Sequence, residues 1–254
     1  AIITPSFAYA TDTLTCTASG VNDPDGDYVQ FIYWLGIGGT YSQGGTQLSP
    51  DNPNTVSSGY SVGDQVFCEI TPYDIDQNNN IISYGTPVST SITIQNSAPT
   101  ISSVVIEYST QQHTSGTFAG DQLTCTPSGG SDADADALTY AYTWYLNGVS
   151  HSTTQNLDTT GMSSGDVVYC SVVANDGTDN SAAVISASTT VYTIHNINIQ
   201  NMAYSPSSIT ITQGDILIWT NLDSVDHTVT EDGTSNVNFN SGLISNGQTY
   251  MMTG

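Results

Sequence analysis

Apolar and β-branched residues occur along this chain in short runs that alternate with polar residues. Examples are QFIYWLGIGG (residues 30–39), TYAYTWYLNG (139–148) and TTVYTIHNINIQ (189–200), and stretches rich in Gly, Asn, Asp and Pro separate such runs. Period-two alternation in short runs bounded by turn residues is typical of antiparallel strands. The pattern therefore predicts an all-β protein built from sandwiches rather than a helical one.

The runs repeat with a period of roughly a hundred residues, which indicates a duplication. Two cysteines with a tryptophan between them mark each unit. These residues are Cys16, Trp34 and Cys68 in the first unit, and Cys125, Trp144 and Cys170 in the second. The motifs around them also correspond, with TLTCTASG matching QLTCTPSG and GDQVFCEI matching GDVVYCSV.

This arrangement resembles the immunoglobulin fold, and specifically the tandem Ig-like or PKD-like repeats of large secreted prokaryotic surface proteins. The resemblance covers residues 1 to about 193. It implies two β-sandwiches, each with a disulfide through its core (Cys16–Cys68 and Cys125–Cys170) and a buried tryptophan packed over the bridge. The alternative use of four cysteines, a metal cluster, lacks a Cys-x-x-Cys spacing.

The remaining residues differ from both repeats, since no cysteine follows Cys170. Tyr204-Ser205-Pro206, Gly214-Asp215, Trp219-Thr220-Asn221 and Asp226-His227-Thr228-Val229 resemble, in order and spacing, the first part of plastocyanin/azurin-like cupredoxins. The predicted domains are therefore an Ig-like repeat at 1–95, a second at 96–193 and a partial cupredoxin-like domain at 194–254. These parts are called below the first repeat, the second repeat and the third segment.

His227 lies where cupredoxins place their first copper ligand. A blue-copper site also needs a Cys thiolate, a second His and a weak axial ligand, and Met251 and Met252 do not have the family's ligand spacing. We therefore expect His227 to be a hydrogen-bonded loop histidine, and copper not to bind to this chain alone. The alternative is a secreted or anchored blue-copper electron-transfer protein whose remaining ligands lie beyond residue 254.

The charge balance is extreme, with 23 acidic residues, no Lys and no Arg, and a net charge of −23. Nucleic-acid binding depends on Lys and Arg and is therefore excluded as a function class. An anionic membrane surface would repel the chain, and no apolar run approaches the ~20 residues of a membrane span. We expect salt or bound divalent cations to relieve the repulsion.

Alternating aspartates point to calcium, a hard cation that prefers oxygen ligands. They lie after the first and after the second cysteine of each repeat, in the B–C and F–G loops, which share one end of an Ig sandwich. In the second repeat this end should face the linker 96–100. A solvated acidic turn is the alternative. The candidate ligands are Asp23, Asp25, Asp27, Asp74 and Asp76 in the first repeat, and Asp132, Asp134, Asp136, Asp176 and Asp179 in the second.

No catalytic constellation stands out, so we predict that the chain is not an enzyme. The predicted disulfides indicate an extracellular or cell-surface location. The favoured function is a structural one, as part of a surface stalk, adhesin or filament. A carbohydrate-binding module is a further alternative, which would need an exposed row of Tyr or Trp. The expected partners are other surface proteins or copies of the chain, joined head to tail when Ala1–Pro5 adds as a strand to the third segment.

Overall fold

The computed structural model of the chain describes residues 1–254 except 21–27, 38–39, 48–53, 57–58, 109–115 and 233–238. Every regular element in these described residues is a β-strand, and none is a helix. The prediction of an all-β fold is therefore confirmed.

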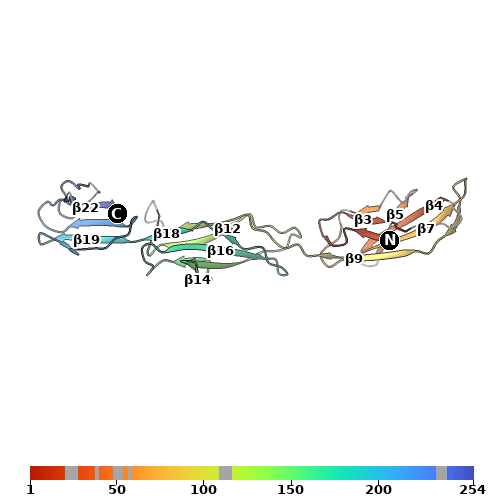
Figure 1. Ribbon diagram of the computed structural model, residues 1–254, viewed down its shortest axis with the longest axis horizontal. Helices are drawn as coiled ribbons and strands as arrows, with labels where there is room; N and C mark the ends of the chain where they lie inside the picture. The colour runs from red at the N-terminus through yellow and green to blue at the C-terminus, as the bar shows by residue number, and fades with distance from the viewer. Residues whose placement is uncertain (21–27, 38–39, 48–53, 57–58, 109–115, 233–238) are drawn as a thin grey trace. The chain divides into compact units, whose positions relative to one another are not determined.

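The first repeat contains two sheets (Figure 1). The smaller has the strand order β1-β3-β6, and the larger β2-β9-β7-β4-β5 with β8 paired to β7. Neighbouring strands are antiparallel except β2 and β9, which are parallel. The strands are β1 (Ile2–Thr4), β2 (Ala8–Tyr9), β3 (Leu14–Thr17), β4 (Tyr28–Ile37), β5 (Thr40–Gln47), β6 (Asn54–Val56), β7 (Gln65–Ile75), β8 (Ile81–Tyr84) and β9 (Val88–Gln95).

The second repeat has the same topology. Its smaller sheet is β10-β12-β15 and its larger sheet β11-β18-β16-β13-β14, with β17 paired to β16 and with β11 and β18 parallel. The duplication predicted from the cysteine motifs is therefore confirmed, because each strand of the first repeat has a counterpart at the same place in the sheets of the second. The strands are β10 (Ser103–Tyr108), β11 (Thr117–Phe118), β12 (Gln122–Ser128), β13 (Thr139–Leu146), β14 (Val149–Ser152), β15 (Asn156–Asp158), β16 (Val167–Asn175), β17 (Val184–Ile185) and β18 (Thr189–Tyr192).

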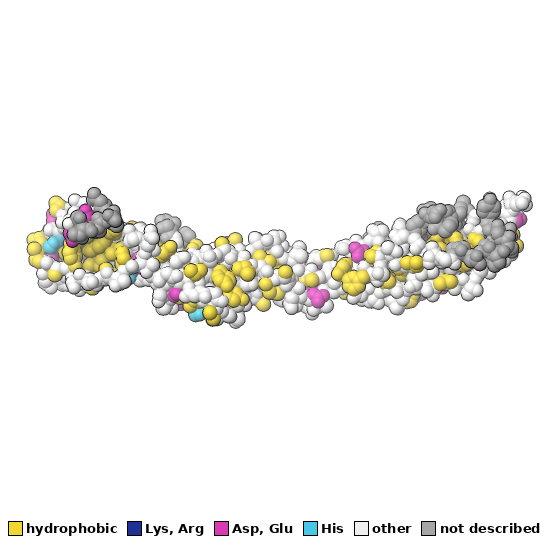
Figure 2. Space-filling model, in the orientation of Figure 1, with side chains coloured by type: hydrophobic (Ala, Val, Ile, Leu, Met, Phe, Trp, Pro, Cys, Tyr) yellow, Lys and Arg dark blue, Asp and Glu magenta, His cyan; other side chains and the backbone are white. Residues whose placement is uncertain are grey.

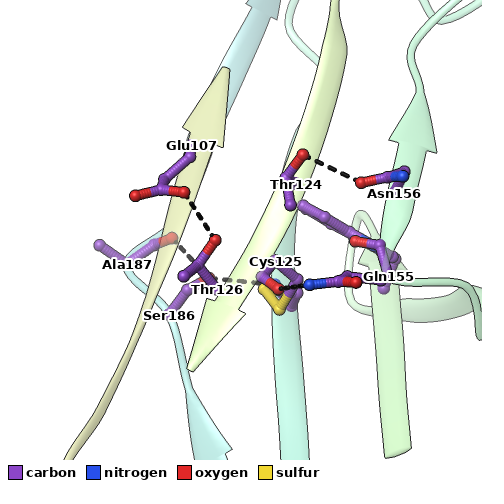
Figure 3. The surroundings of a disulfide bond; sticks show 10 residues. Glu107, Thr124, Cys125, Thr126, Gln155, Asn156, Ser186 and Ala187 are labelled. Atoms are coloured by element: carbon purple, nitrogen blue, oxygen red, sulfur yellow. Dashed lines mark hydrogen bonds between the residues drawn. A yellow bond between two sulfur atoms is a disulfide. The ribbon is translucent and has the colours of Figure 1, made fainter. Parts of the chain in front are cut away.

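A disulfide joins the two sheets of each repeat. Cys16 on β3 bonds to Cys68 on β7, and Cys125 on β12 bonds to Cys170 on β16. All four residues are fully buried. Figure 3 shows the second bridge with the polar contacts of the strands around it, including the hydrogen bond from the Thr126 hydroxyl to the Glu107 carboxylate (2.8 Å).

The aromatic residue in the core differs between the repeats. Trp144 on β13 is fully buried, as expected. In the first repeat the expectation was wrong, because Tyr33 is fully buried and its neighbour Trp34 is partly exposed. Successive side chains of a strand point to opposite faces, so a shift of one residue moves a side chain out of the core. Tyr33 therefore takes the core position that corresponds to Trp144.

The third segment forms a four-stranded sheet with the order β20-β19-β21-β22. Its strands are β19 (Ile194–Gln200), β20 (Ala203–Ser205), β21 (Ile216–Asn221) and β22 (Thr249–Thr253), and β19 and β21 are parallel. One face packs with Val229 and Ile244 around the buried Trp219. The cupredoxin-like identity of this segment stays a prediction.

Packing divides the described chain into two compact units rather than three. The first comprises Ala1–Thr100, Gly130–Thr139 and Ala174–Ser181, and the second Ile101–Gly129, Tyr140–Val173 and Ala182–Gly254. Two acidic loops of the second repeat thus pack with the first repeat and the linker, and the third segment packs with the body of the second repeat. The predicted boundaries at 95/96 and 193/194 follow the sheets and stay a prediction.

Candidate functional sites

The linker after the first repeat contacts aspartates of both acidic loops of the second repeat. The Asn96 side-chain amide donates hydrogen bonds to the carboxylates of Asp176 and Asp179, both at 2.9 Å. The Ser97 N–H donates to Asp134 Oδ2 at 2.7 Å. These contacts, called here the first joint, bring together three of the ten predicted calcium ligands. The hydrogen bond from the Asn96 side chain and that from the Asp179 N–H lower the pKa of Asp176.

Two carboxylate oxygens in the B–C loop of the second repeat are buried without a hydrogen-bond partner among the described residues. They are Asp132 Oδ2 and Asp134 Oδ1. A buried carboxylate oxygen without a donor is costly, which fits a site for a cation. The described part of the chain nevertheless contains no group of three His, Cys, Asp or Glu side chains placed to hold a metal ion. Asp136 contributes its N–H to Asp132. Calcium at this joint stays a prediction.

The acidic loops of the first repeat give less support for a metal site. Asp23, Asp25 and Asp27 lie outside the described residues. The Asp76 carboxylate accepts hydrogen bonds from Asn78 and Asn80, and those from Asn80 contribute most to lowering its pKa. Ser83 donates its hydroxyl to Asp74. Asp74 and Asp76 therefore hold the hairpin that leads to β8, as expected for an acidic turn.

His227 is held by a carboxylate. Its Nε2 lies 2.9 Å from Asp223 Oδ2, and both side chains are 15% exposed. Asp223 also accepts hydrogen bonds from the Met202 and Asn201 N–H groups, and these contacts lower its pKa, that from Met202 most. His227 is therefore hydrogen-bonded, and its role as a copper-free loop histidine stays a prediction. Blue copper stays an untested alternative, which absorbance after addition of Cu(II) can decide.

A carboxylate that the sequence did not mark as a site, that of Asp215, accepts four hydrogen bonds. Its side chain is 1% exposed and lies 2.9 Å from His195 Nε2. It also accepts hydrogen bonds from the Thr193 and Thr212 N–H groups and from the Ser164 hydroxyl. Burial opposes its ionisation, but these hydrogen bonds prevail and lower its pKa from 3.8 to about 2. These contacts, called here the second joint, connect the second repeat to the third segment.

An apolar groove of about 640 Å³ opens on the third segment, lined by Ile211, Leu217, Trp219, Phe239 and Met252 among others. Figure 2 shows hydrophobic side chains gathered on this segment. Residues 206–213, two of which line the groove, are exposed and lie outside any strand. These features suit the receiving side of the predicted strand addition.

The predicted donor strand is not free. Ile2–Thr4 forms β1, which pairs with β3 of its own sandwich, and Ile3 is buried. This segment was expected to be available because it is apolar and uncharged. Those same properties let it complete the first repeat.

Comparisons with known proteins find distant structural similarity only. No protein-family model matches the chain, and no curated protein matches it. Among solved structures, the FN1–FN3 domains of chicken CNTN1 are 7% identical (TM-score 0.28), over 75% of this chain and 66% of that one. The Clostridium thermocellum CbhA fibronectin(III)-like modules are 12% identical (TM-score 0.22), over 75% and 90%. Three N-terminal domains of the bacteriophage RB49 Hoc protein are 14% identical (TM-score 0.28), over 98% and 83%.

Similarity at this level carries no information on activity or partners. The described residues contain no helix long and apolar enough to cross a membrane.

Proposed function

We propose that the chain is a structural segment of an extracellular or cell-surface assembly, such as a stalk, adhesin or filament. The observation that supports this proposal most is the duplicated sandwich, in which the same sheet topology occurs twice with one buried disulfide in each copy. Disulfides persist in oxidising compartments and are rare in the cytosol.

Some polar contacts of the described residues hold consecutive domains together. The residues that follow the last strand of each repeat donate hydrogen bonds to aspartates further along the chain, Asn96 and Ser97 at the first joint and Thr193 at the second. Such contacts suit a protein that keeps consecutive sandwiches in register. We propose that the chain has a structural role and is not an enzyme.

Association with other copies through the groove of the third segment is part of the same proposal. A strand laid beside residues 206–213 would cover Ile211, which is 40% exposed, and would pair with main-chain groups that lie outside any strand. Because β1 is already paired, the donor must be a different strand or must first leave its own sheet.

Location and oxidation state together test the proposal. Intact cells that make the protein are treated with a thiol-alkylating reagent, then fractionated, and the chain is analysed by mass spectrometry. We expect it in the surface or secreted fraction, with Cys16–Cys68 and Cys125–Cys170 intact and no alkylated cysteine. Recovery from the cytosol with alkylated cysteines would overturn the proposal.

A further inference from the structure

The second joint takes its hydrogen bonds from both sides of the domain boundary. Ser164, in the turn before β16, and Thr193, after β18, belong to the second repeat. Thr212 and His195 belong to the third segment. All four donate to one carboxylate, that of Asp215, which is almost fully buried. A buried carboxylate depends on all its donors, because each one that is lost leaves a charge that water cannot reach.

Comparison of the two repeats singles out Ser164. The turns Ser61-Val62-Gly63-Asp64 and Ser163-Ser164-Gly165-Asp166 occupy equivalent places before β7 and β16, and the first serine N–H of each donates to the aspartate of its own turn, at 2.7 and 2.8 Å. The second position differs. Val62 is 40% exposed, whereas Ser164 donates to Asp215. The serine thus occurs in the repeat that precedes the third segment.

Close packing accompanies the polar contacts. Gly214 has a φ of +103°, and a Cβ placed on it would lie 2.2 Å from Cε1 of the Tyr192 ring. Tyr192 is the last residue of β18 in the second repeat. The Ile216 N–H also donates to the Thr193 carbonyl at 3.0 Å. Side-chain, steric and main-chain contacts therefore all cross the boundary within a few residues of Asp215.

We infer that Asp215 locks the second repeat and the third segment into a single cooperative folding unit. The third segment presents a four-stranded sheet with an open groove, and so it gains stability from the donors that the second repeat supplies. The division by packing agrees, since the body of the second repeat and the third segment fall into one compact unit. This inference concerns folding and goes beyond the proposed function. Its test does not depend on whether the protein is extracellular.

Hydrogen exchange in increasing denaturant, read by mass spectrometry on peptides from β16 and β21, tests the lock. In the natural chain we expect the slowest amides of both strands to lose protection at the same denaturant concentration. Ser164→Ala removes a donor without altering the third segment, and should lower the protection of β21 roughly ten- to a hundredfold, as for a hydrogen bond to a charged group. Loss of protection in β21 well before β16 in the natural chain would overturn the inference.

Asp223 provides the matched control. Its carboxylate has a similar set of donors, Asn201, Met202 and His227, but all of them lie within the third segment. Asp215→Asn and Ser164→Ala should be strongly non-additive in β21 protection, and Asp223→Asn and Ser164→Ala additive. If Asp215→Asn prevents folding of the third segment, Ser164→Ala alone still decides the matter. A Ser164→Ala chain with unchanged β21 protection contradicts the lock.

Discussion

Carboxylates in this chain take hydrogen bonds from N–H groups, hydroxyls and imidazoles, because there is no Lys or Arg to pair with. Among the described residues, a recurring turn does this five times, with the N–H of residue i donating to the aspartate at i+3. The aspartates concerned are Asp12, Asp64, Asp121, Asp166 and Asp215. Four of them follow a glycine, so Gly-Asp before an apolar run is a motif that the sequence displays. The extra partners of Asp215 are not readable from the sequence, because they come from residues up to 51 positions away.

Replacing Gly214 by alanine tests the packing at the second joint. The new Cβ would clash with the Tyr192 ring, and the positive φ adds backbone strain. We expect a loss of ~3 kcal/mol or more in the stability of the third segment, measured by chemical denaturation with Trp219 fluorescence. Gly247→Ala is the control, since Gly247 also has a positive φ but no atom within 4 Å of its Cβ position. It should cost only ~1 kcal/mol, and equal losses would contradict the packing described.

Acid should act on Asp215 at unusually low pH. The ordinary pKa of an aspartate side chain is 3.8, and the pKa of Asp215 in the folded chain is about 2. The folded state therefore favours the ionised form of this carboxyl group. The stability that this gives is fully present above pH 3.8 and is lost as pH falls through about 2. Melting of the natural chain and of Asp215→Asn should therefore differ by a constant amount at neutral and mildly acidic pH and converge near pH 2. A difference already lost at pH 5 would contradict this.

The alternation of apolar and polar side chains predicts where strands occur more reliably than it predicts which face of a strand is buried. The runs around Trp34 and Trp144 were both predicted to be strands, and β4 and β13 are the result. The face of β4 was misassigned because Phe31, Tyr33 and Trp34 are all large and apolar, so that period-two alternation does not separate them. In β13 the neighbours of Trp144 are Thr143 and Tyr145, and the largest apolar side chain is the buried one.

Alanine substitutions at neighbouring positions of β4 test this assignment. Tyr33→Ala should lower the free energy of unfolding of the first repeat by roughly 3–5 kcal/mol, as for other large core aromatics. Trp34→Ala should cost clearly less although tryptophan is larger, because Trp34 is partly exposed. Urea denaturation followed by far-UV circular dichroism measures both variants. The reverse order would place Trp34 in the core and refute the register.

At the scale of the whole molecule, the sequence predicted the parts better than the joints. Cysteine and tryptophan spacing identified two sandwiches, and the structure contains both with their disulfides. The expected approach of the acidic loops to the linker is seen for Asp134, Asp176 and Asp179. The second joint was not predicted, because Ser164 and Thr193, which donate to Asp215 from the second repeat, lie 51 and 22 positions away in the sequence.

Calcium should stabilise the first joint if it binds there. Saturation at a hundred times the dissociation constant would add about 2.7 kcal/mol to the stability of the folded state. Scanning calorimetry in calcium and in chelator should therefore show a higher melting temperature with calcium, and Asp134→Asn with Asp176→Asn should remove the difference. Asp158→Asn, an exposed aspartate on β15, is the control. Identical melting of the natural chain in calcium and chelator would end the prediction.

Stretching single molecules of the full chain tests the central claim, that disulfide-closed sandwiches in series form a structural element. The bridges exclude loops of 52 and 45 residues from extension. We expect distinct force peaks for the repeats, and length gains that grow on reduction by roughly 19 and 16 nm, at ~3.6 Å per residue. A chain that extends without force peaks, or whose length gains do not change on reduction, would contradict the account.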